Sequence, residues 1–226
     1  MKILVTGANG FLGFSLAKKL ISKGHDLLVI SKNVDKLSSI LEHCSFIKSY
    51  TEDLHLHKDL IESFSPNIVI HFGWWGGNSY YDTNSLDQYH NNIPPNIKFL
   101  DLLSSLNSKP KFIGVGSFAE YGQVDSTIDE TYKENPINHY GISKLILKQY
   151  SQKFCKQNNL KWAWIRPCYV YGPGDKEVRL IPTLIKKFTN NQFIELDECK
   201  TEIDYMYIDD FTNLLYQLII LDYEGV

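Results

Sequence analysis

The sequence predicts an α/β fold in which helices cover both faces of one parallel sheet. Three observations predict it. Short runs of β-forming residues alternate with segments whose apolar residues recur at helical spacing. A glycine-rich turn joins the first run to the first helical segment, and 226 residues suffice for one large domain with a substantial core. Because such alternation implies right-handed crossovers, the expected architecture is a doubly wound, Rossmann-type domain.

Six apolar runs are the expected strands, in chain order. They span residues 3–5, 27–30, 46–47, 68–71, 112–115 and 162–165. The segments between them show helical periodicity at residues 12–21, 54–64, 97–106 and 142–154. Together these elements place the expected dinucleotide-binding domain at residues 1–166.

After Arg166 the rhythm of the sequence changes. A turn is expected at residues 171–174, a helix at 178–188, a strand at 205–208 and a last helix at 211–221. We interpret residues 167–226 as a small substrate-binding lobe whose last helix returns to the main domain.

Composition and charge exclude several classes of function. The net charge is -3, and no stretch forms a long basic run, so nucleic acid is not an expected partner. Gly7 and Gly10 interrupt the apolar start of the chain, which is therefore too short for a signal-peptide core or a membrane span. The four separated cysteines have no metal-ligand spacing, so we expect no metal, and reduced thiols predict a cytoplasmic protein.

The glycine turn after the first strand is the expected dinucleotide site. Gly7 suits the tight turn, Gly10 lets the backbone approach a pyrophosphate, and Gly13 allows close helix packing. The free amides at the start of the following helix favour the anion. The alternative is a strand-helix turn that binds nothing, but its position at the start of an alternating chain favours the dinucleotide.

The end of the second strand bears on the choice of cofactor. A carboxylate there would hydrogen bond to a free adenosine ribose and repel a 2′-phosphate. This chain has Ser31 and Lys32 instead. A hydroxyl and a cation suit a phosphate, so the sequence favours NADP(H). NAD(H) is the alternative, in which Lys32 is only a solvated loop residue.

Tyr140 and Lys144 are the candidate proton-transfer pair. Residues four apart on a helix share a face, so the Lys144 ammonium is expected beside the Tyr140 hydroxyl. A neighbouring cation lowers the pKa of a phenol from its usual value of ~10, towards the working pH of a catalyst. By itself the spacing also fits an ordinary exposed helix face.

The glycine turn and the Tyr140 and Lys144 pair are together similar to those of the short-chain dehydrogenase/reductase superfamily. More narrowly, they resemble its extended branch, the NAD-dependent epimerase/dehydratase family of nucleotide-sugar epimerases, dehydratases and ketoreductases. Further matching segments follow in the same order at residues 53–54, 66–73, 92–100, 117–122, 166–174 and 204–210. The resemblance therefore covers nearly the whole chain.

The resemblance implies further cofactor contacts. Besides the glycines, Ser31 and Lys32, they are Phe11, Leu12, Asp53, Leu54, Phe72, Gly73, Asn92, Tyr140, Lys144 and Pro167. Asp53 and Leu54 would flank the adenine. Phe72 and Gly73 would line the path of the phosphates and ribose, and Pro167 would lie at the nicotinamide amide.

The resemblance also implies a catalytic triad of Ser117, Tyr140 and Lys144. In the reductive direction, Ser117 would orient the substrate oxygen that receives a proton from Tyr140. Lys144 would hold the cofactor ribose and tune Tyr140. For Ser117 the alternative is an ordinary turn hydroxyl at the end of a strand.

Residues next to Ser117 argue against dehydration. The resembled sugar 4,6-dehydratases place an Asp-Glu pair directly after the Ser/Thr position, whereas this chain has Phe118 and Ala119, neither of which can transfer a proton. Glu120 follows, but in a strand-like segment its side chain would point to the opposite face, so we do not expect it to be the missing base.

The substrate side departs from the resembled family. Tyr169 stands where an asparagine is usual and Ile203 where an arginine is usual, and both usual residues hold the nucleotide diphosphate. Arg179, on the expected lobe helix, is a candidate replacement contact for phosphate, or else a surface residue. Tyr169 and Arg179 are thus the candidate substrate-binding residues. The chain also stops where the resembled enzymes continue, so the lobe is expected to be incomplete, through truncation or as a naturally minimal form.

The leading functional prediction is NADP(H)-dependent reduction of a 4-keto-6-deoxy nucleotide sugar. A nucleotide-sugar 4-epimerase with tightly bound NAD is the alternative, because it uses the same triad. A non-catalytic dinucleotide sensor belongs to another class, and an intact triad argues against it. The resemblance further implies a homodimer formed through helices at residues 86–106 and 142–154.

Overall fold

The central sheet contains six parallel strands in the order β3-β2-β1-β4-β5-β6, within the residues that the computed structural model describes, 1–76, 80–196 and 198–226. They are β1 (Lys2–Thr6), β2 (Asp26–Ser31), β3 (Ser45–Lys48), β4 (Ile68–His71), β5 (Lys111–Val115) and β6 (Trp162–Ile165). This order confirms the doubly wound, Rossmann-type prediction. The order reverses between β1 and β4, and ligands bind at such a point, beyond the carboxyl ends of the strands.

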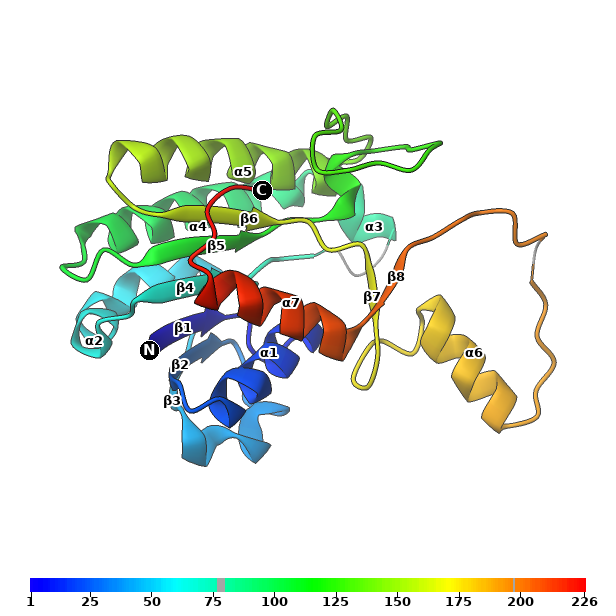
Figure 1. Ribbon diagram of the computed structural model, residues 1–226, viewed down its shortest axis with the longest axis horizontal. Helices are drawn as coiled ribbons and strands as arrows, with labels where there is room; N and C mark the ends of the chain where they lie inside the picture. The colour runs from blue at the N-terminus through cyan, green and yellow to red at the C-terminus, as the bar shows by residue number, and fades with distance from the viewer. Residues whose placement is uncertain (77–79, 197) are drawn as a thin grey trace.

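Helices cover both faces of this sheet (Figure 1). One face packs against α1 (Phe11–Ser22) and α7 (Ile208–Ile220), and the other against α2 (Lys58–Phe64), α4 (Asp87–Ser105) and α5 (His139–Gln157). Because side chains alternate along a strand, β1 contributes Ile3 and Val5 to one hydrophobic core and Leu4 to the other. The last helix, α7, thus returns to the main body of the fold.

Two helices differ most from the predicted ranges. The expected helix at 54–64 is divided into a 3-10 segment, η3 (Thr51–His57), and α2, because the backbone of His57 is not helical. Helix α4 starts ten residues earlier than its apolar periodicity predicted, near the start of the range 86–106 that the resemblance implied. Its buried positions in the first turns are Gln88, Asn92 and Asn96, so no apolar periodicity marks them, and the helix continues through two prolines.

The remaining short elements lie in the connections. They are η1 (Leu37–Ser39), η2 (Leu41–His43), α3 (Tyr80–Thr83) and η4 (Phe118–Glu120). No helix among the described residues is long and apolar enough to cross a membrane.

A second, two-stranded sheet and one helix extend from the carboxyl end of the main sheet (Figure 1). Strand β7 (Tyr169–Tyr171) pairs in parallel with β8 (Tyr205–Tyr207), and α6 (Leu180–Thr189) projects beyond them. The turn predicted at 171–174 follows β7, and none of the residues of α6 is buried.

The last residues of the chain lie along the edge of the main sheet. Gly225 pairs in parallel with Ala163 of β6, and its carbonyl accepts a hydrogen bond of 2.8 Å from Trp164 N. Asp222 forms an ion pair of 3.2 Å with the buried Lys111 at the start of β5. The C-terminal segment is therefore joined to both strands at this side of the sheet.

Candidate active site

The glycine turn between β1 and α1 packs tightly against the segment that follows β4. Gly7 has φ +69°, and a Cβ there would lie 2.8 Å from the carbonyl carbon of Phe72 and 2.9 Å from Gly73 N. A Cβ on Gly13 would lie 2.5 Å from Gly7 O. Only glycine fits at these positions, so the turn brings its backbone against Phe72 and Gly73 at the switch point of the sheet.

The start of α1 offers free amides to an anion. Gly10 is its N-cap, and within this fully described helix no side chain caps the first turn and no acidic residue lies in it. Phe11 and Leu12 begin the helix, so their N–H groups face the crevice side of the turn. A glycine cradle with uncapped helical amides fits the pyrophosphate of a dinucleotide.

A hydrogen-bonded loop flanks the expected adenosine end of this site. Ser31 ends β2 and is buried, whereas Lys32 is exposed. The side chain of Asn9, in the glycine turn, hydrogen bonds to the Asn33 side chain and accepts a bond of 2.9 Å from Lys36 N. Sequence reasoning missed Asn9 and Asn33, although the place of Asn9 inside the glycine turn was a usable signal.

Two residues expected to contact the cofactor have buried side chains. Leu54 is 2% exposed and packs in the core beneath α4, and Asn92 is fully buried. The Asn92 amide instead bonds to the backbone of Trp75, accepting from its N–H at 2.8 Å and donating to its carbonyl at 3.1 Å. Asn92 thus fixes the loop after β4, and the cofactor contacts expected of Leu54 and Asn92 stay predictions. Asp53, beside Leu54 in η3, is half-buried.

The structure brings Ser117, Tyr140 and Lys144 together. Ser117 follows β5, and the other two lie on α5, whose N-cap Asn138 accepts a hydrogen bond of 2.7 Å from Gly141 N. Burial raises the pKa of Tyr140, while a hydrogen bond with the Ser117 side chain acts in the opposite direction. The pKa of this phenol is therefore not lowered in the free protein, as the neighbouring cation had led us to expect, because desolvation is the larger effect.

Lys144 is almost completely buried. Its ammonium donates a hydrogen bond of 2.8 Å to the carbonyl of Val115 and lies 5.8 Å from the centre of the Tyr140 ring. Burial lowers the pKa of Lys144 to about 7, and the carboxylate of Glu120 opposes that shift. The amine therefore titrates near neutral pH.

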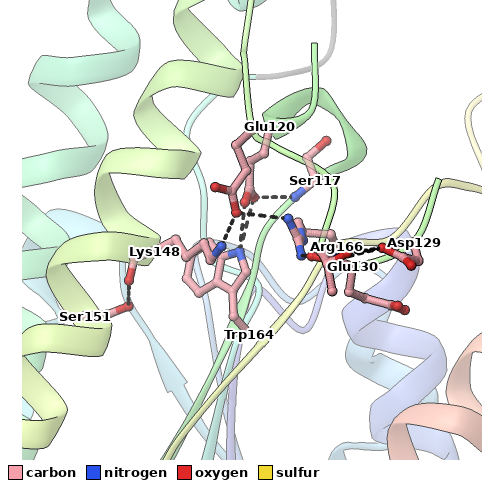
Figure 2. Close-up of polar contacts among 10 residues, drawn as sticks. Ser117, Glu120, Asp129, Glu130, Lys148, Ser151, Trp164 and Arg166 are labelled. Carbon is pink, nitrogen blue, oxygen red and sulfur yellow. Dashed lines mark hydrogen bonds and ion pairs between the residues drawn. The ribbon is translucent and has the colours of Figure 1, made fainter. Parts of the chain in front are cut away.

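Glu120 occupies a place that the sequence did not reveal. It ends the 3-10 turn η4, not a strand, and its fully buried carboxylate accepts hydrogen bonds from Ser117 N at 2.8 Å and from the Trp164 indole at 3.1 Å (Figure 2). Burial raises the pKa of Glu120 to about 7. Glu120 faces the interior, so it is not the missing base, and it fixes the backbone of Ser117. Gly116 makes room, since a Cβ there would lie 2.1 Å from the carboxylate.

Arg166 holds the loop on the other side of Ser117. Its guanidinium donates to the Glu130 carbonyl at 2.8 Å (Figure 2). It also donates to Glu134 at 3.1 Å and lies 4.3 Å from the centre of the Tyr121 ring. Pro167, the next residue, accepts a hydrogen bond of 3.1 Å from Phe118 N. Pro167 is thus joined to the segment that carries Ser117.

The two candidate substrate residues lie apart from one another. Tyr169 is 49% exposed, and its ring contacts those of Phe118 and Tyr205. Arg179 precedes α6 instead of lying within it, and it forms an ion pair of 3.2 Å with Asp175. Its charge acts to lower the pKa of Tyr140. Arg179 is therefore electrostatically coupled to the triad although it is half exposed.

An open cavity of about 1550 Å³ lies between β6, α7 and the lobe. Phe118, Tyr169 and Ile203 line it, but the triad does not. The two hydroxyls and the amine of the expected triad converge outside this cavity, and Phe118, next to Ser117, lies at the border between the two regions. Among the described residues, no group of three His, Cys, Asp or Glu side chains could hold a metal ion.

Comparison with known proteins matches residues 3–222 to the sequence model of the NAD dependent epimerase/dehydratase family. The chain is 27% identical to dTDP-6-deoxy-L-talose 4-dehydrogenase (NAD(+)) of Aggregatibacter actinomycetemcomitans, over 100% of this chain and 83% of that protein. It is 26% identical to dTDP-4-dehydro-6-deoxyglucose reductase of Escherichia coli, over 99% of this chain and 73% of that protein. UDP-glucose 4-epimerase of Thermus thermophilus, solved with NAD, has a similar fold, with a TM-score of 0.85 and 21% identity over 100% of this chain and 76% of that one.

Proposed function

Because the chain belongs to the NAD dependent epimerase/dehydratase family, we propose that it reduces the 4-keto group of a 6-deoxy nucleotide sugar with a nicotinamide cofactor. The convergence of Ser117, Tyr140 and Lys144 carries this proposal. Phe118 and Ala119 offer no acid or base for dehydration, which leaves carbonyl-alcohol interconversion. The names of the two relatives above, a 4-dehydrogenase and a 4-dehydro-6-deoxy sugar reductase, support the same substrate class.

The chain's own residues account for the proton and the orientation of the substrate. When bound, the nicotinamide supplies the hydride. The Ser117 hydroxyl is placed to hydrogen bond to the substrate oxygen, because its backbone is fixed by Glu120. The Tyr140 hydroxyl donates its proton to that oxygen, and the Lys144 ammonium stabilises the phenolate that remains. Gly7, Gly10 and Gly13 form the cradle for the pyrophosphate.

For the cofactor we propose NADP(H), since Lys32 and Lys36 lie in the loop after β2 and Ser31 stands where a carboxylate would repel a phosphate. NAD(H) is the alternative. The name of the talose dehydrogenase and the NAD in the Thermus epimerase structure favour it. Dissociation constants for NADPH and NADH, measured at the same ionic strength, distinguish the two cofactors. Tighter binding of NADH would reverse the proposal.

A 4-epimerase is the second candidate, because it would use the same triad and because the fold matches that of a UDP-glucose 4-epimerase. Tightly bound NAD in the purified protein, without net consumption, would favour epimerisation. Stoichiometric NAD(P)H oxidation in the presence of a 4-keto sugar would favour reduction. A panel of nucleotide 4-keto sugars tests reduction, and the corresponding 4-hydroxy nucleotide sugars test epimerisation.

Tyr140→Phe tests the catalytic assignment. Removing the proton donor is expected to lower kcat by about 100-fold or more while the nucleotide still binds. Tyr150→Phe is the matched control, because it changes a half-buried tyrosine on the same helix that stacks on Phe154. Unchanged turnover in Tyr140→Phe would refute the proposal.

Two further assignments are part of the proposal. We assign residues 1–166 to cofactor binding and 167–226 to the substrate side, in a cytoplasmic enzyme. We also propose a homodimer through the outer faces of α4 and α5, which lie side by side (Figure 1). Tyr89 of α4 contacts His139 of α5 between them.

A further inference from the structure

The indole of Trp74 covers the ammonium of Lys144. The nitrogen of Lys144 lies 3.7 Å from the centre of the Trp74 ring, well within the distance at which an aromatic face attracts a cation. The Trp74 and Tyr140 rings meet edge to face, with centres 6.2 Å apart and planes at 90°. The two rings form an aromatic corner, and the Lys144 ammonium lies in it.

Buried polar groups fix the orientation of Trp74. Its indole N–H donates a hydrogen bond of 3.0 Å to the side-chain oxygen of Gln88, which is fully buried. The Gln88 amide donates in turn to the carbonyl of Asp82 at 2.8 Å. Gly76 allows this approach, because a Cβ there would lie 2.5 Å from the Gln88 nitrogen. A side chain held in this way is built into the site, unlike a surface tryptophan.

The surroundings of Lys144 act on its pKa in opposite directions. Burial disfavours the ammonium, and the buried carboxylate of Glu120, from η4, favours it. His71 of β4 also faces Lys144, but burial, assisted by the Lys144 charge, lowers the pKa of His71 to about 3, so it is neutral. Tyr140, on the same helix, is neutral until its raised pKa is reached. The aromatic corner adds to the effect of Glu120, because it attracts only the charged form of the amine.

We propose that Trp74 is a positioning residue for the proton transfer: its indole holds Lys144 as a cation in the aromatic corner beside Tyr140. The role of Tyr140 in this statement rests on the proposed function. The contact between Trp74 and Lys144 does not, since it belongs to the protein alone.

Trp74→Leu removes the aromatic face. Losing a desolvated contact of this kind is expected to lower the pKa of Lys144 by about one unit, because the contact stabilises only the charged amine. The alkaline limb of the kcat/KM profile is then expected to move about one pH unit lower. Above that limb the variant would be roughly tenfold slower than the wild type, and well below it the two would be equal.

The decisive measurement is an NMR titration of the lysine ε-methylene groups in the whole protein without ligand, with the Lys144 signal assigned through Lys144→Met. Trp74→Leu is expected to lower the Lys144 pKa by about one unit, and Trp74→Phe, which keeps an aromatic face but not the bond to Gln88, by less. Trp75→Leu, at the neighbouring exposed tryptophan, is the matched control and should leave it unchanged.

The two proposals fail in different ways. An unchanged Lys144 pKa in both Trp74 variants would overturn the role of Trp74, whatever the activity. A shifted Lys144 pKa in the Trp74 variants, with no turnover of any keto sugar by the wild type, would overturn the proposed function. It would still support the contact between Trp74 and Lys144. A shifted pKa with an unshifted kcat/KM profile would show that Lys144 is not the group that limits the reaction at high pH, which also contradicts the positioning role.

Discussion

Glu120 is a carboxylic acid enclosed by the protein, and its pKa of about 7 has a consequence for stability. The group ordinarily ionises at 4.5. Between these two values the folded state binds a proton that the unfolded state has lost. Folding stability must therefore fall as the pH rises through this window, by at most about 3 kcal/mol from this group.

Glu120→Gln is expected to remove that dependence. The variant keeps an oxygen acceptor for Ser117 N but does not titrate there. Its free energy of unfolding relative to the wild type should increase between pH 5 and pH 7, on the order of 1–3 kcal/mol. Urea denaturation at the two pH values measures the difference. Glu130→Gln, at an exposed carboxylate in the following loop, is the control, and an equal difference at both pH values would contradict the expectation.

For single residues, the sequence motifs predicted which residues form the site better than they predicted where each side chain points. The spacing of Tyr140 and Lys144 and the place of Ser117 were enough to bring the three together. Glu120 and Trp74 were missed, because the direction of each side chain depends on what surrounds it. A 3-10 turn directs Glu120 inwards, and the remote Gln88 fixes Trp74, and neither contact leaves a periodic signal in the sequence.

Among the elements, the turn between β1 and α1 shows how closely the backbone segments pack around the expected pyrophosphate. A methyl group at Gly13 would meet the carbonyl oxygen of Gly7, which is backbone and cannot rotate away. The helix start must then shift, and with it the amides that are expected to hold the anion. The same substitution thus links folding to cofactor binding.

Gly13→Ala is expected to destabilise the protein by about 2 kcal/mol or more and to weaken dinucleotide binding at least tenfold. Thermal unfolding and a cofactor titration measure the two effects. Gly24→Ala, just after α1, is the control: it meets nothing within 4 Å, so only its positive φ of +74° costs about 1 kcal/mol, and binding should be unchanged. Equal losses in the two variants would count against the packing argument.

Periodicity predicted elements wherever the buried side chains are apolar. All six strands of the main sheet follow this rule, because both their faces are covered. Helix α4 breaks it in its first turns, where Gln88, Asn92 and Asn96 are buried for their hydrogen bonds. Strand β7, just before the expected turn, was not predicted, since its three residues are too few to show alternation.

In the whole molecule, α4 and α5 present a partly apolar outer surface. Ile146 on α5 is 38% exposed, and Tyr150 and Phe154 of the same helix stack on each other half-buried. Ile93 and Ile97 of α4 are half-buried as well. These side chains are the contacts through which the proposed homodimer would form.

Ile146→Glu is expected to convert the dimer to a monomer, because it would place two carboxylates near the centre of an isologous contact. Sedimentation at several concentrations should give twice the chain mass of 26.1 kDa for the wild type and the mass of one chain for the variant. Leu60→Glu, at an exposed leucine on α2, is the control for a new surface charge. A wild type that sediments as a monomer throughout would exclude the dimer.

The two ends of the chain offer very different sites for attaching a tag or a label. Met1 precedes β1 at the amino edge of the sheet, opposite to the carboxyl ends where the cofactor is expected. Val226 instead lines the open cavity and packs against the core next to β6. A label attached at residue 226 would therefore lie at the lining of this cavity, whereas one attached at residue 1 would lie at the opposite end of the strands.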